Sequence, residues 1–152
     1  MEFQREYLET NERLIEELWP LLEAHYIQIA HYKDIPLIPD FEAYRVAEKN
    51  GALRIFTARE RGVIYGYSVF FVRKNVHYST SVQAVQDILY LDPMVRKGST
   101  GYRFIQWCDD QLRADGVQAV YHHVKVDHDF SPVLQRMGYE EIERIFAKRL
   151  DQ

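Results

Sequence analysis

The sequence predicts a mixed α/β (α+β) fold, in which helices pack on one central and mostly antiparallel sheet. Three observations support this class. Apolar residues recur at helical spacing in the first third of the chain, period-two alternation takes over from Ala52, and a later loop with two glycines leads from a strand directly into a helix. The 152 residues are 47% hydrophobic and 28% charged, which suits a single domain over residues 1–152 and argues against disorder.

The N-terminal third is predicted to be helical. Apolar residues recur at helical spacing between Asn11 and His31. Pro20 should kink this helix or start a second one, because proline has no N–H and clashes with the preceding turn. A further helix is predicted from Phe41 to Lys49, and the segment from Phe3 to Leu8 is compatible with a short strand that precedes both helices.

Three strands are predicted next. The segments Ala52–Arg59 and Val63–Arg73 form a hairpin around a turn at Arg61-Gly62. A third strand runs from Val82 to Asp92 and ends at Pro93, which cannot donate to the sheet. Period-two alternation places five apolar residues of the second hairpin strand on one face: Val63, Tyr65, Tyr67, Val69 and Phe71.

A βαβ crossover is predicted after the third strand. The basic loop Val95–Gly101 leads into a helix that ends near Asp115, and the near-continuous apolar run Val117–Val126 is typical of a central strand. The buried stripe of this helix is predicted to contain Ile105, Cys108 and Leu112, with Phe104 alongside.

The chain is predicted to end with a short helix and one more strand. Ser131 is expected to be the N-cap of this helix, with Pro132 at the first helical position, and Gly138 ends it. The segment Arg144–Leu150 is predicted to be the last strand of the sheet.

Charge and cysteine usage limit the function classes. The net charge is −4 and the pI is near 5.9, which argues against whole-surface nucleic-acid binding. Cys108 is the only cysteine, so a reducing compartment is expected. The N-terminus is acidic and lacks the apolar core of a signal peptide, and no apolar run approaches the roughly 18 residues of a membrane helix. A cytoplasmic protein with no membrane association is therefore expected.

The loop after the third strand is the candidate ligand-binding segment. It contains two cations, Arg96 and Lys97, the glycines Gly98 and Gly101, and two hydroxyl groups, and it ends where a helix begins. The first turn of a helix has unpaired N–H groups and the positive end of the helix dipole. Such a loop suits a pyrophosphate. The alternative is a basic, capped turn that binds nothing.

These residues resemble the GNAT N-acetyltransferases. In that superfamily the pattern Arg/Gln-x-x-Gly/Ala-x-Gly/Ala opens a helix after a strand. Arg96 matches the first position and Gly101 the last, whereas Ser99 stands at the middle small position and Gly98 is displaced by one. The segment Asp129–Tyr139 resembles the family's short helix followed by Gly-Phe or Gly-Tyr. His77-Tyr78 and the run from His123 to Phe130 resemble short phage- and prophage-type members.

The resemblance implies an acetyl-CoA-dependent N-acetyltransferase with a βαβ core that binds CoA. The third strand and the strand that begins at Val117 should splay apart, so that the pantetheine arm lies between them. Backbone groups near the end of the third strand would contact this arm, and the loop would hold the pyrophosphate. The expected cofactor-binding residues are Tyr90, Leu91, Val95, Arg96, Lys97, Gly98, Ser99, Thr100, Gly101 and Tyr102.

Candidate acid–base residues are fewer. Many family members have a tyrosine in the short helix, but the corresponding position here is Leu134. Tyr139 and Tyr102 are possible substitutes, although both are also ordinary packing residues. Asp87, inside the third strand, is the first choice for general base. His77, in the polar connection before that strand, is a second candidate base, with an ordinary surface histidine as the alternative.

Other readings stay open. The missing tyrosine and Ser99 also fit a catalytically degenerate CoA-binding or protein-interaction module on the same fold. A toxin that acetylates aminoacyl-tRNA fits the fold but not the acidic balance. His123 and His128 give no convincing ligand geometry, so no metal is expected. The acceptor is an amine whose identity the sequence does not reveal, and the aromatic content is compatible with a homodimer.

Overall fold

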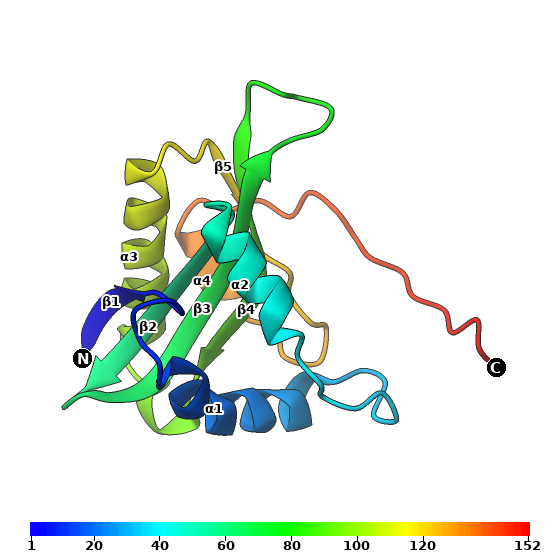
Figure 1. Ribbon diagram of the computed structural model, residues 1–152. Coiled ribbons are helices and arrows are strands. Elements are labelled where there is room, and N and C mark those ends of the chain that lie inside the picture. The colour runs from blue at the N-terminus through cyan, green and yellow to red at the C-terminus, as the bar shows by residue number, and fades with distance from the viewer.

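The computed structural model describes residues 1–152 and shows one five-stranded sheet with helices against it (Figure 1). The strand order is β1-β2-β3-β4-β5, and all neighbours are antiparallel except β4 and β5. This confirms the predicted class. The elements are β1 (Glu2–Glu6), α1 (Leu14–Ile29), α2 (Phe41–Lys49), β2 (Leu53–Glu60), β3 (Val63–Lys74), β4 (Val82–Leu91), the 3₁₀ turn η1 (Pro93–Val95), α3 (Thr100–Ala114), β5 (Ala119–Tyr121) and α4 (Ser131–Arg136).

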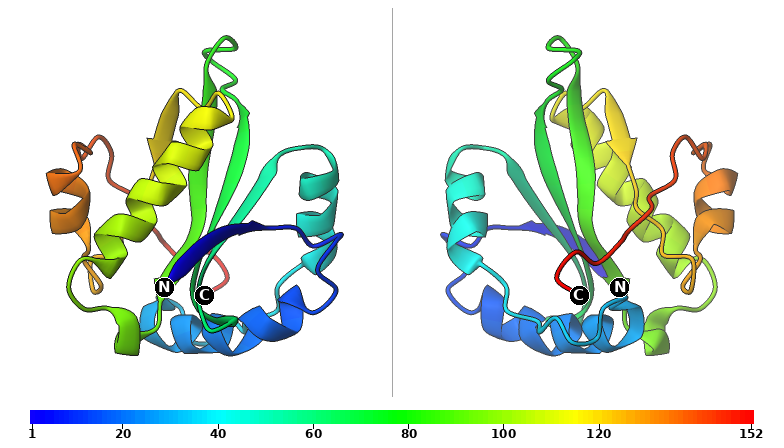
Figure 2. Two further views of the ribbon diagram at one scale, coloured as in Figure 1. Left: turned by 90° about the vertical axis from the view of Figure 1, so that its left-hand side faces the viewer. Right: turned by 90° about the vertical axis from the view of Figure 1, so that its right-hand side faces the viewer.

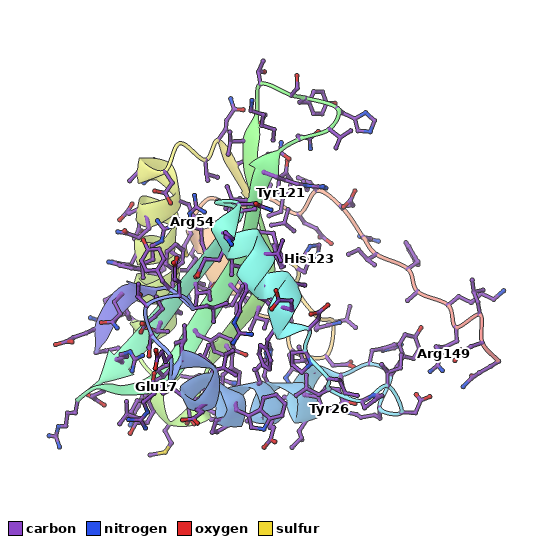
Figure 3. All side chains as sticks on the ribbon, in the orientation of Figure 1. Glu17, Tyr26, Arg54, Tyr121, His123 and Arg149 are labelled. Atoms are coloured by element: carbon purple, nitrogen blue, oxygen red, sulfur yellow. The ribbon has the colours of Figure 1, made fainter.

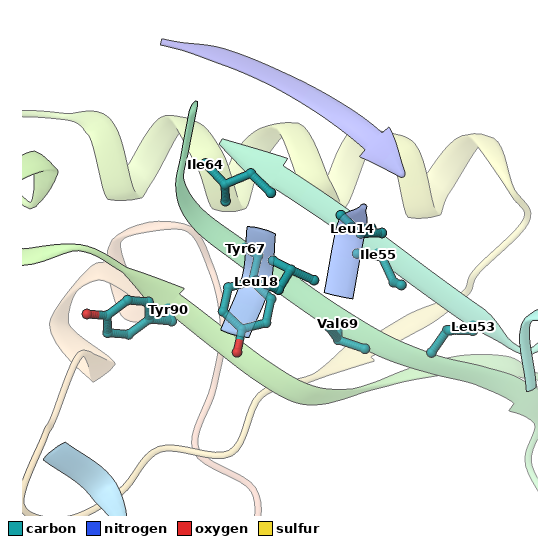
Figure 4. Close-up of a cluster of buried hydrophobic side chains, with 8 residues drawn as sticks. All are labelled: Leu14, Leu18, Leu53, Ile55, Ile64, Tyr67, Val69 and Tyr90. Atoms are coloured by element: carbon teal, nitrogen blue, oxygen red, sulfur yellow. The ribbon is translucent and has the colours of Figure 1, made fainter. Parts of the chain in front are cut away.

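The sheet has a core on each face. Helices α1 and α2 lie on one side and α3 and α4 on the other (Figure 2). On the first side, Leu14 and Leu18 of α1 pack on the strands (Figure 4). On the second side the predicted stripe of α3 is buried, as expected: Phe104, Ile105, Cys108 and Leu112 are all at most 4% exposed. No helix is both long enough and apolar enough to cross a bilayer.

The N-terminal elements largely follow the sequence. Helix α2 has the predicted bounds, and β1 forms at Glu2–Glu6, close to the expected short strand. Pro20 lies inside α1, so no second helix starts there. Leu14 and Leu18 of the same helix are buried against the sheet on the N-terminal side of this proline.

A buried ion cluster joins β1 and α1 to the sheet. The Nε of Arg59, at the end of β2, donates to Glu6 Oε1 of β1 at 2.7 Å, and its Nη1 donates to Glu17 Oε1 of α1 at 3.0 Å. Hydrogen bonding to Arg59 lowers the pKa of Glu17 below its ordinary value. Both N-terminal elements are therefore held at one end of the sheet.

The predicted face of β3 is partly wrong. Tyr67, Val69 and Phe71 do pack on the α1 side, but Ile64 joins them and Val63 is 54% exposed. The register shifts between Ala58 and Arg59, which pair with Gly66 and Ile64, so that Tyr65 has no partner residue in β2. This bulge reverses the alternation, and a regular period-two pattern cannot reveal it.

The C-terminal third departs most from prediction. The run Val117–Val126 was expected to form a central strand, but β5 has three residues and lies at the sheet edge. The expected last strand at Arg144–Leu150 is absent, because this segment is extended chain without strand pairing. Helix α4 forms where predicted, except that Phe130 is the N-cap and Ser131 is the first helical residue.

Candidate active site

A gap opens where β4 and β5 part. Only Gln83–Val85 of β4 pair with Ala119–Tyr121 of β5, whereas β4 continues to Leu91. The next residues on the two strands meet through side chains instead, since His122 Nδ1 lies 2.7 Å from Gln86 Oε1. The edge of β4 from Gln86 to Leu91 therefore has no strand beside it, as expected for the splayed pair.

The loop between β4 and α3 has open backbone amides. Its first part is internally bonded, because Met94 N donates to Asp92 Oδ1 at 2.8 Å and Val95 N donates to Asp92 O at 2.9 Å. Further along, several amides have no acceptor in the protein. They belong to Lys97, Gly98, Ser99, Gly101 and Tyr102. Unpaired amides in the first turn of a helix make a site for anions.

Small residues keep this backbone accessible. Gly98 has a φ of +61°, a conformation that L side chains rarely adopt. A Cβ at Gly101 would come no nearer than 3.7 Å to Leu91 Cδ1, so packing inside the protein does not require glycine there. Ser99 makes no capping bond with its side chain, and its hydroxyl stays free. A ligand that approaches the amides closely would explain all three residues.

The Arg96 side chain turns away from these amides. Its Nε donates to Leu91 O at 2.5 Å and its Nη2 to Gln28 Oε1 of α1 at 3.0 Å, and the guanidinium lies over the Tyr90 ring. The Tyr90 ring also contacts His25, with ring centroids 5.0 Å apart. Tyr90 is 3% exposed, so only its backbone is available to a ligand. The remaining members of the predicted set are Val95, the last residue of η1, and Thr100, the first residue of α3, and the backbone amides of both donate within the protein.

A large cavity extends from α1 past the gap to α4. Its volume is about 1860 Å³, and its wall contains parts of α1, α2, β2, β3, β4, β5, α4 and the segments that follow α1, β5 and α4. The wall is mainly apolar and aromatic. Its carboxylates, Asp87, Asp129, Glu140, Glu141 and Glu143, outnumber its cations, Lys125 and Arg144. The cavity therefore favours a cationic guest with apolar parts.

Asp87 lies in this cavity because β4 bulges. Val69 pairs with Ile88 and Phe70 with Gln86, so Asp87 has no partner residue in β3. The Tyr44 hydroxyl of α2 donates to Asp87 Oδ2 at 2.5 Å. The carboxyl group is accessible through the cavity, yet the surrounding protein desolvates it and raises its pKa above 3.8, although the Tyr44 hydrogen bond acts in the opposite direction.

The other two candidate acid–base residues are placed differently. The Tyr139 hydroxyl donates to Asp109 Oδ1 of α3 at 2.7 Å, and burial raises the pKa of this tyrosine. His77 is exposed in the β3–β4 connection, and its backbone amide bonds to Asn75 Oδ1. This connection lies at the opposite end of β4 from the loop (Figure 1). The structure does not bring His77 together with the other candidates.

Two buried side-chain polar atoms have no hydrogen-bond partner in the protein, and neither residue was among the predicted site residues. They are the Tyr67 hydroxyl on β3 and His122 Nε2. Both residues belong to the cavity wall. Burial lowers the pKa of His122 to about 4, so its ring is neutral at pH 7. Buried polar groups normally have a hydrogen-bond partner, so these two atoms are candidates for contacts with bound substrates. The sequence singled out Tyr67 only through the period-two alternation of β3, which predicts a side chain that packs in the core.

No group of three or more His, Cys, Asp or Glu side chains is arranged to hold a metal ion. No protein-family model matches the chain, and no curated protein matches it either. Solved structures do resemble it.

An aminoglycoside acetyltransferase from an uncultured soil metagenomic sample, solved with trehalose, has a TM-score of 0.75 at 19% identity. The match covers 98% of this chain and 95% of the acetyltransferase chain. The ribosomal-protein-alanine N-acetyltransferase of Brucella melitensis biovar Abortus 2308 has a TM-score of 0.70 at 16% identity, with coverage of 99% and 100%. A predicted acetyltransferase of Clostridium acetobutylicum, solved with acetyl-CoA, has a TM-score of 0.69 at 12% identity, with coverage of 98% and 96%. The chain therefore has the GNAT fold.

Proposed function

We propose that this chain, which has the fold of the GNAT N-acetyltransferases, transfers the acetyl group of acetyl-CoA to a primary amine. One observation carries the proposal. The amides of Gly98, Ser99, Gly101 and Tyr102 have no acceptor in the protein, and they lie at the end of the strand beside which the gap opens. A dianionic pyrophosphate joined to an extended arm matches both features.

Acetyl-CoA would lie across the gap. The loop amides and the positive end of the α3 dipole would bind the pyrophosphate. The unpaired edge of β4 from Gln86 to Leu91 would bond to the amide groups of the pantetheine arm, much as an added strand does. The thioester would then lie beside the cavity. Since the acceptor enters through the cavity and the donor through the gap, the two substrates meet from opposite sides of β4.

Asp87 is the proposed general base. Asp87 accepts a proton from the ammonium group of the acceptor, and the neutral nitrogen then attacks the thioester carbonyl carbon and forms a C–N bond. The C–S bond breaks, and the leaving CoA thiolate takes up the second proton that the nitrogen loses, so that the products are the acetamide, free CoA and one proton. Positioning of the two substrates supplies most of the acceleration, and proton transfer contributes about 10²–10⁴-fold. The Tyr67 hydroxyl would donate to the bound substrates.

The acceptor proposed here is a cationic amine. Carboxylates outnumber cations in the cavity wall, and aromatic rings such as those of Tyr26 and Tyr121 provide faces for an ammonium group. Aminoglycosides are polycationic amines, and one structural neighbour is an aminoglycoside acetyltransferase solved with sisomicin, with a TM-score of 0.75 at 18% identity. This likeness supports the chemical class and leaves the individual acceptor open.

A second candidate function is CoA binding without catalysis. Leu134 is buried in α4 where many family members have a tyrosine, and the nearby Tyr139 hydroxyl already donates to Asp109 at 2.7 Å. No tyrosine of this region is then free to protonate the leaving thiolate. A module that binds CoA and presents a surface to another protein would retain the open amides without this group.

Thiol release separates the two candidates. Purified protein is mixed with acetyl-CoA and a panel of mono- and polycationic amines, and free CoA is followed with a thiol-reactive dye. The proposal predicts release that depends on the amine and exceeds hydrolysis in its absence. It also predicts that acetyl-CoA raises the melting temperature, whereas S-acetylpantetheine, which lacks the pyrophosphate, does not at equal concentration. Binding without release supports the module, and no shift at millimolar acetyl-CoA contradicts both.

A further inference from the structure

The guanidinium of Arg96 joins two elements that are distant in the sequence. Its Nε donates to Leu91 O at 2.5 Å, at the end of β4, and its Nη2 donates to Gln28 Oε1 at 3.0 Å, near the end of α1. Its central carbon lies 5.2 Å from the centre of the Tyr90 ring. Figure 2 shows the light-blue end of α1 beside the light-green turn η1, which follows β4. None of these three partners belongs to the part of the loop that has open amides.

The C-terminal end of α1 has no cation of its own. Its last turn contains no basic residue, and the N–H of the C-cap, Ala30, donates to Tyr26 O. The carbonyl groups at the end of a helix carry the negative end of its dipole, and a cation nearby stabilises them. Because Arg96 bonds to Gln28, it brings a positive charge to this end from another element.

The two halves of α1 are attached to the sheet unequally. Leu14 and Leu18, in the first half, are at most 6% exposed. Pro20 then interrupts the backbone hydrogen bonding of the helix, because it has no N–H. After this proline the apolar side chains that pack on the core, such as Leu22, are only partly buried. The second half of α1 therefore depends more on individual contacts, of which the bond to Arg96 is one.

A neutral histidine completes this contact. The rings of His25 and Tyr90 have centroids 5.0 Å apart, so the Tyr90 ring contacts both His25 and Arg96. Burial lowers the pKa of His25 to about 4, and the positive charges of Arg96, His128 and Lys125 act in the same direction. At pH 7 the His25 ring is uncharged, so it does not repel the guanidinium.

The end of α1 forms part of the wall of the acceptor cavity. Tyr26 and Ile29, in its last two turns, both line this cavity. The Tyr26 hydroxyl donates to Lys33 O at 3.2 Å and also to Ile35 O, in the connection from α1 to α2, and Ile35 lines the same cavity. Figure 3 shows Tyr26 at the end of α1 that leads into this connection. A shift of this helix end would therefore move both parts of the wall.

We propose that Arg96 is a positioning residue for the acceptor cavity and not a ligand of the pyrophosphate. Its side chain holds the end of α1 against the end of β4, and the contact persists while the loop amides bind the diphosphate. Through α1 it keeps His25, Tyr26 and Ile29 in the cavity wall. The effect on the acceptor rests on the proposed acetyl transfer, whereas the contact between Arg96 and α1 does not.

Hydrogen exchange tests the contact without any catalytic readout. In Arg96→Met the amides from Tyr26 to Ile29 should exchange roughly tenfold faster than in the wild type, whereas those of α2 should not change. Gln28→Met removes the other partner and should have the same effect. Lys97→Met is the matched control, because it removes the same charge one residue away, and it should exchange like the wild type. Unchanged exchange in Arg96→Met overturns the proposal.

Binding and kinetics then separate the two roles of a cation in this loop. Calorimetry should give Arg96→Met and Lys97→Met dissociation constants for CoA within about threefold of each other, since each variant loses one charge. Only Arg96→Met and Gln28→Met should raise KM, by roughly tenfold, for the amine that is acetylated fastest in the thiol-release panel, with little change in kcat. The double variant should be no worse than the poorer single variant.

The opposite pattern would overturn the proposal. A tenfold loss of CoA affinity confined to Arg96→Met, with an unchanged KM for the amine, would identify Arg96 as a pyrophosphate ligand. If no amine in the panel is acetylated, the proposed function fails, and the exchange experiment alone decides whether Arg96 holds the end of α1.

Discussion

Asp87 owes its position to one irregular residue in β4. In a regular strand the adjacent side chains of Asp87 and Ile88 would lie on opposite faces, but the bulge opposite Val69 and Phe70 breaks the alternation, and both residues line the cavity. The bulge brings a carboxylate and the Tyr44 hydroxyl together in the cavity wall. The sequence identified Asp87 as a candidate because a carboxylate before an apolar run is unusual, but it did not indicate Tyr44.

Asp87→Asn is expected to lower kcat by about 10²–10⁴-fold, because the amide cannot accept the proton of the amine. The dissociation constant for CoA should not change, since Asp87 lies in the acceptor cavity and outside the loop. Steady-state kinetics and calorimetry measure the two quantities separately. Unchanged turnover would remove Asp87 from the mechanism.

Tyr44→Phe tests the same carboxylate through pH dependence. A general base must be ionised, so the rate should fall as the pH drops through the pKa of Asp87. The Tyr44 hydrogen bond lowers this pKa. Its removal should therefore raise the pKa and move the acidic limb of the kcat/KM profile to higher pH, while the fold is retained. A limb that stays in place would show that Asp87 does not control it.

Substitution of Tyr67 is expected to change stability and activity in opposite directions. Its hydroxyl is buried without a partner, which costs about 1–3 kcal/mol in the free protein. Tyr67→Phe should therefore raise the free energy of unfolding in urea and lower kcat/KM for the acceptor, since the substrates lose a donor. A destabilised variant would mean that the hydroxyl has a partner, and unchanged kinetics would mean that it does not contact the substrates.

At the scale of elements, the end of β4 links the sheet to the loop, and two glycines there have opposite roles. A Cβ at Gly66 would lie 2.2 Å from Leu91 Cδ2 and 2.9 Å from Tyr90 O, so β3 and β4 can approach only with glycine. A Cβ at Gly101 has room inside the protein. The first glycine is therefore required by packing, whereas packing does not require the second, which belongs to the proposed pyrophosphate site.

Gly66→Ala should destabilise the protein by about 1–3 kcal/mol, because backbone and side chain must both shift. Gly101→Ala should leave stability unchanged or raise it by up to about 1 kcal/mol, since alanine favours a helix. Its methyl group should nevertheless weaken acetyl-CoA binding at least tenfold, because it occupies the mouth of the gap beside Leu91. Urea unfolding and calorimetry on both variants check this. Equal effects of the two variants on binding would contradict the distinct roles.

Elements with local signals were predicted well, and those that depend on distant partners were not. The hairpin, α2 and α3 carry their own turns, caps and apolar stripes, and the structure confirms them. The length of β5 depends on where β4 diverges from it, and the fate of Arg144–Leu150 depends on whether a neighbouring edge is available. The apolar patterns of these two segments therefore predict neither the length of β5 nor the lack of strand pairing at Arg144–Leu150.

At the scale of the whole molecule, the β4–β5 gap and the cavity lie next to each other along β4, so that two substrates can reach the same part of this strand. In the proposed arrangement acetyl-CoA enters at the loop and the gap along β4, and the acceptor enters through the cavity under α1 and α2. The sequence indicated the loop, because its glycines and cations are contiguous between a strand and a helix. The cavity is lined by segments from α1 to residue 147, which only the fold brings together.

The most direct test follows the backbone amides of 15N-labelled protein as CoA is added. The signals of Gly98, Ser99, Gly101 and Tyr102 should shift strongly, because their N–H groups gain acceptors. The signals of Gly51 and Gly62, in turns outside the site, should stay in place. Four unmoved loop signals at saturating CoA, or shifts confined to other parts of the chain, would contradict the account of this loop as the diphosphate site.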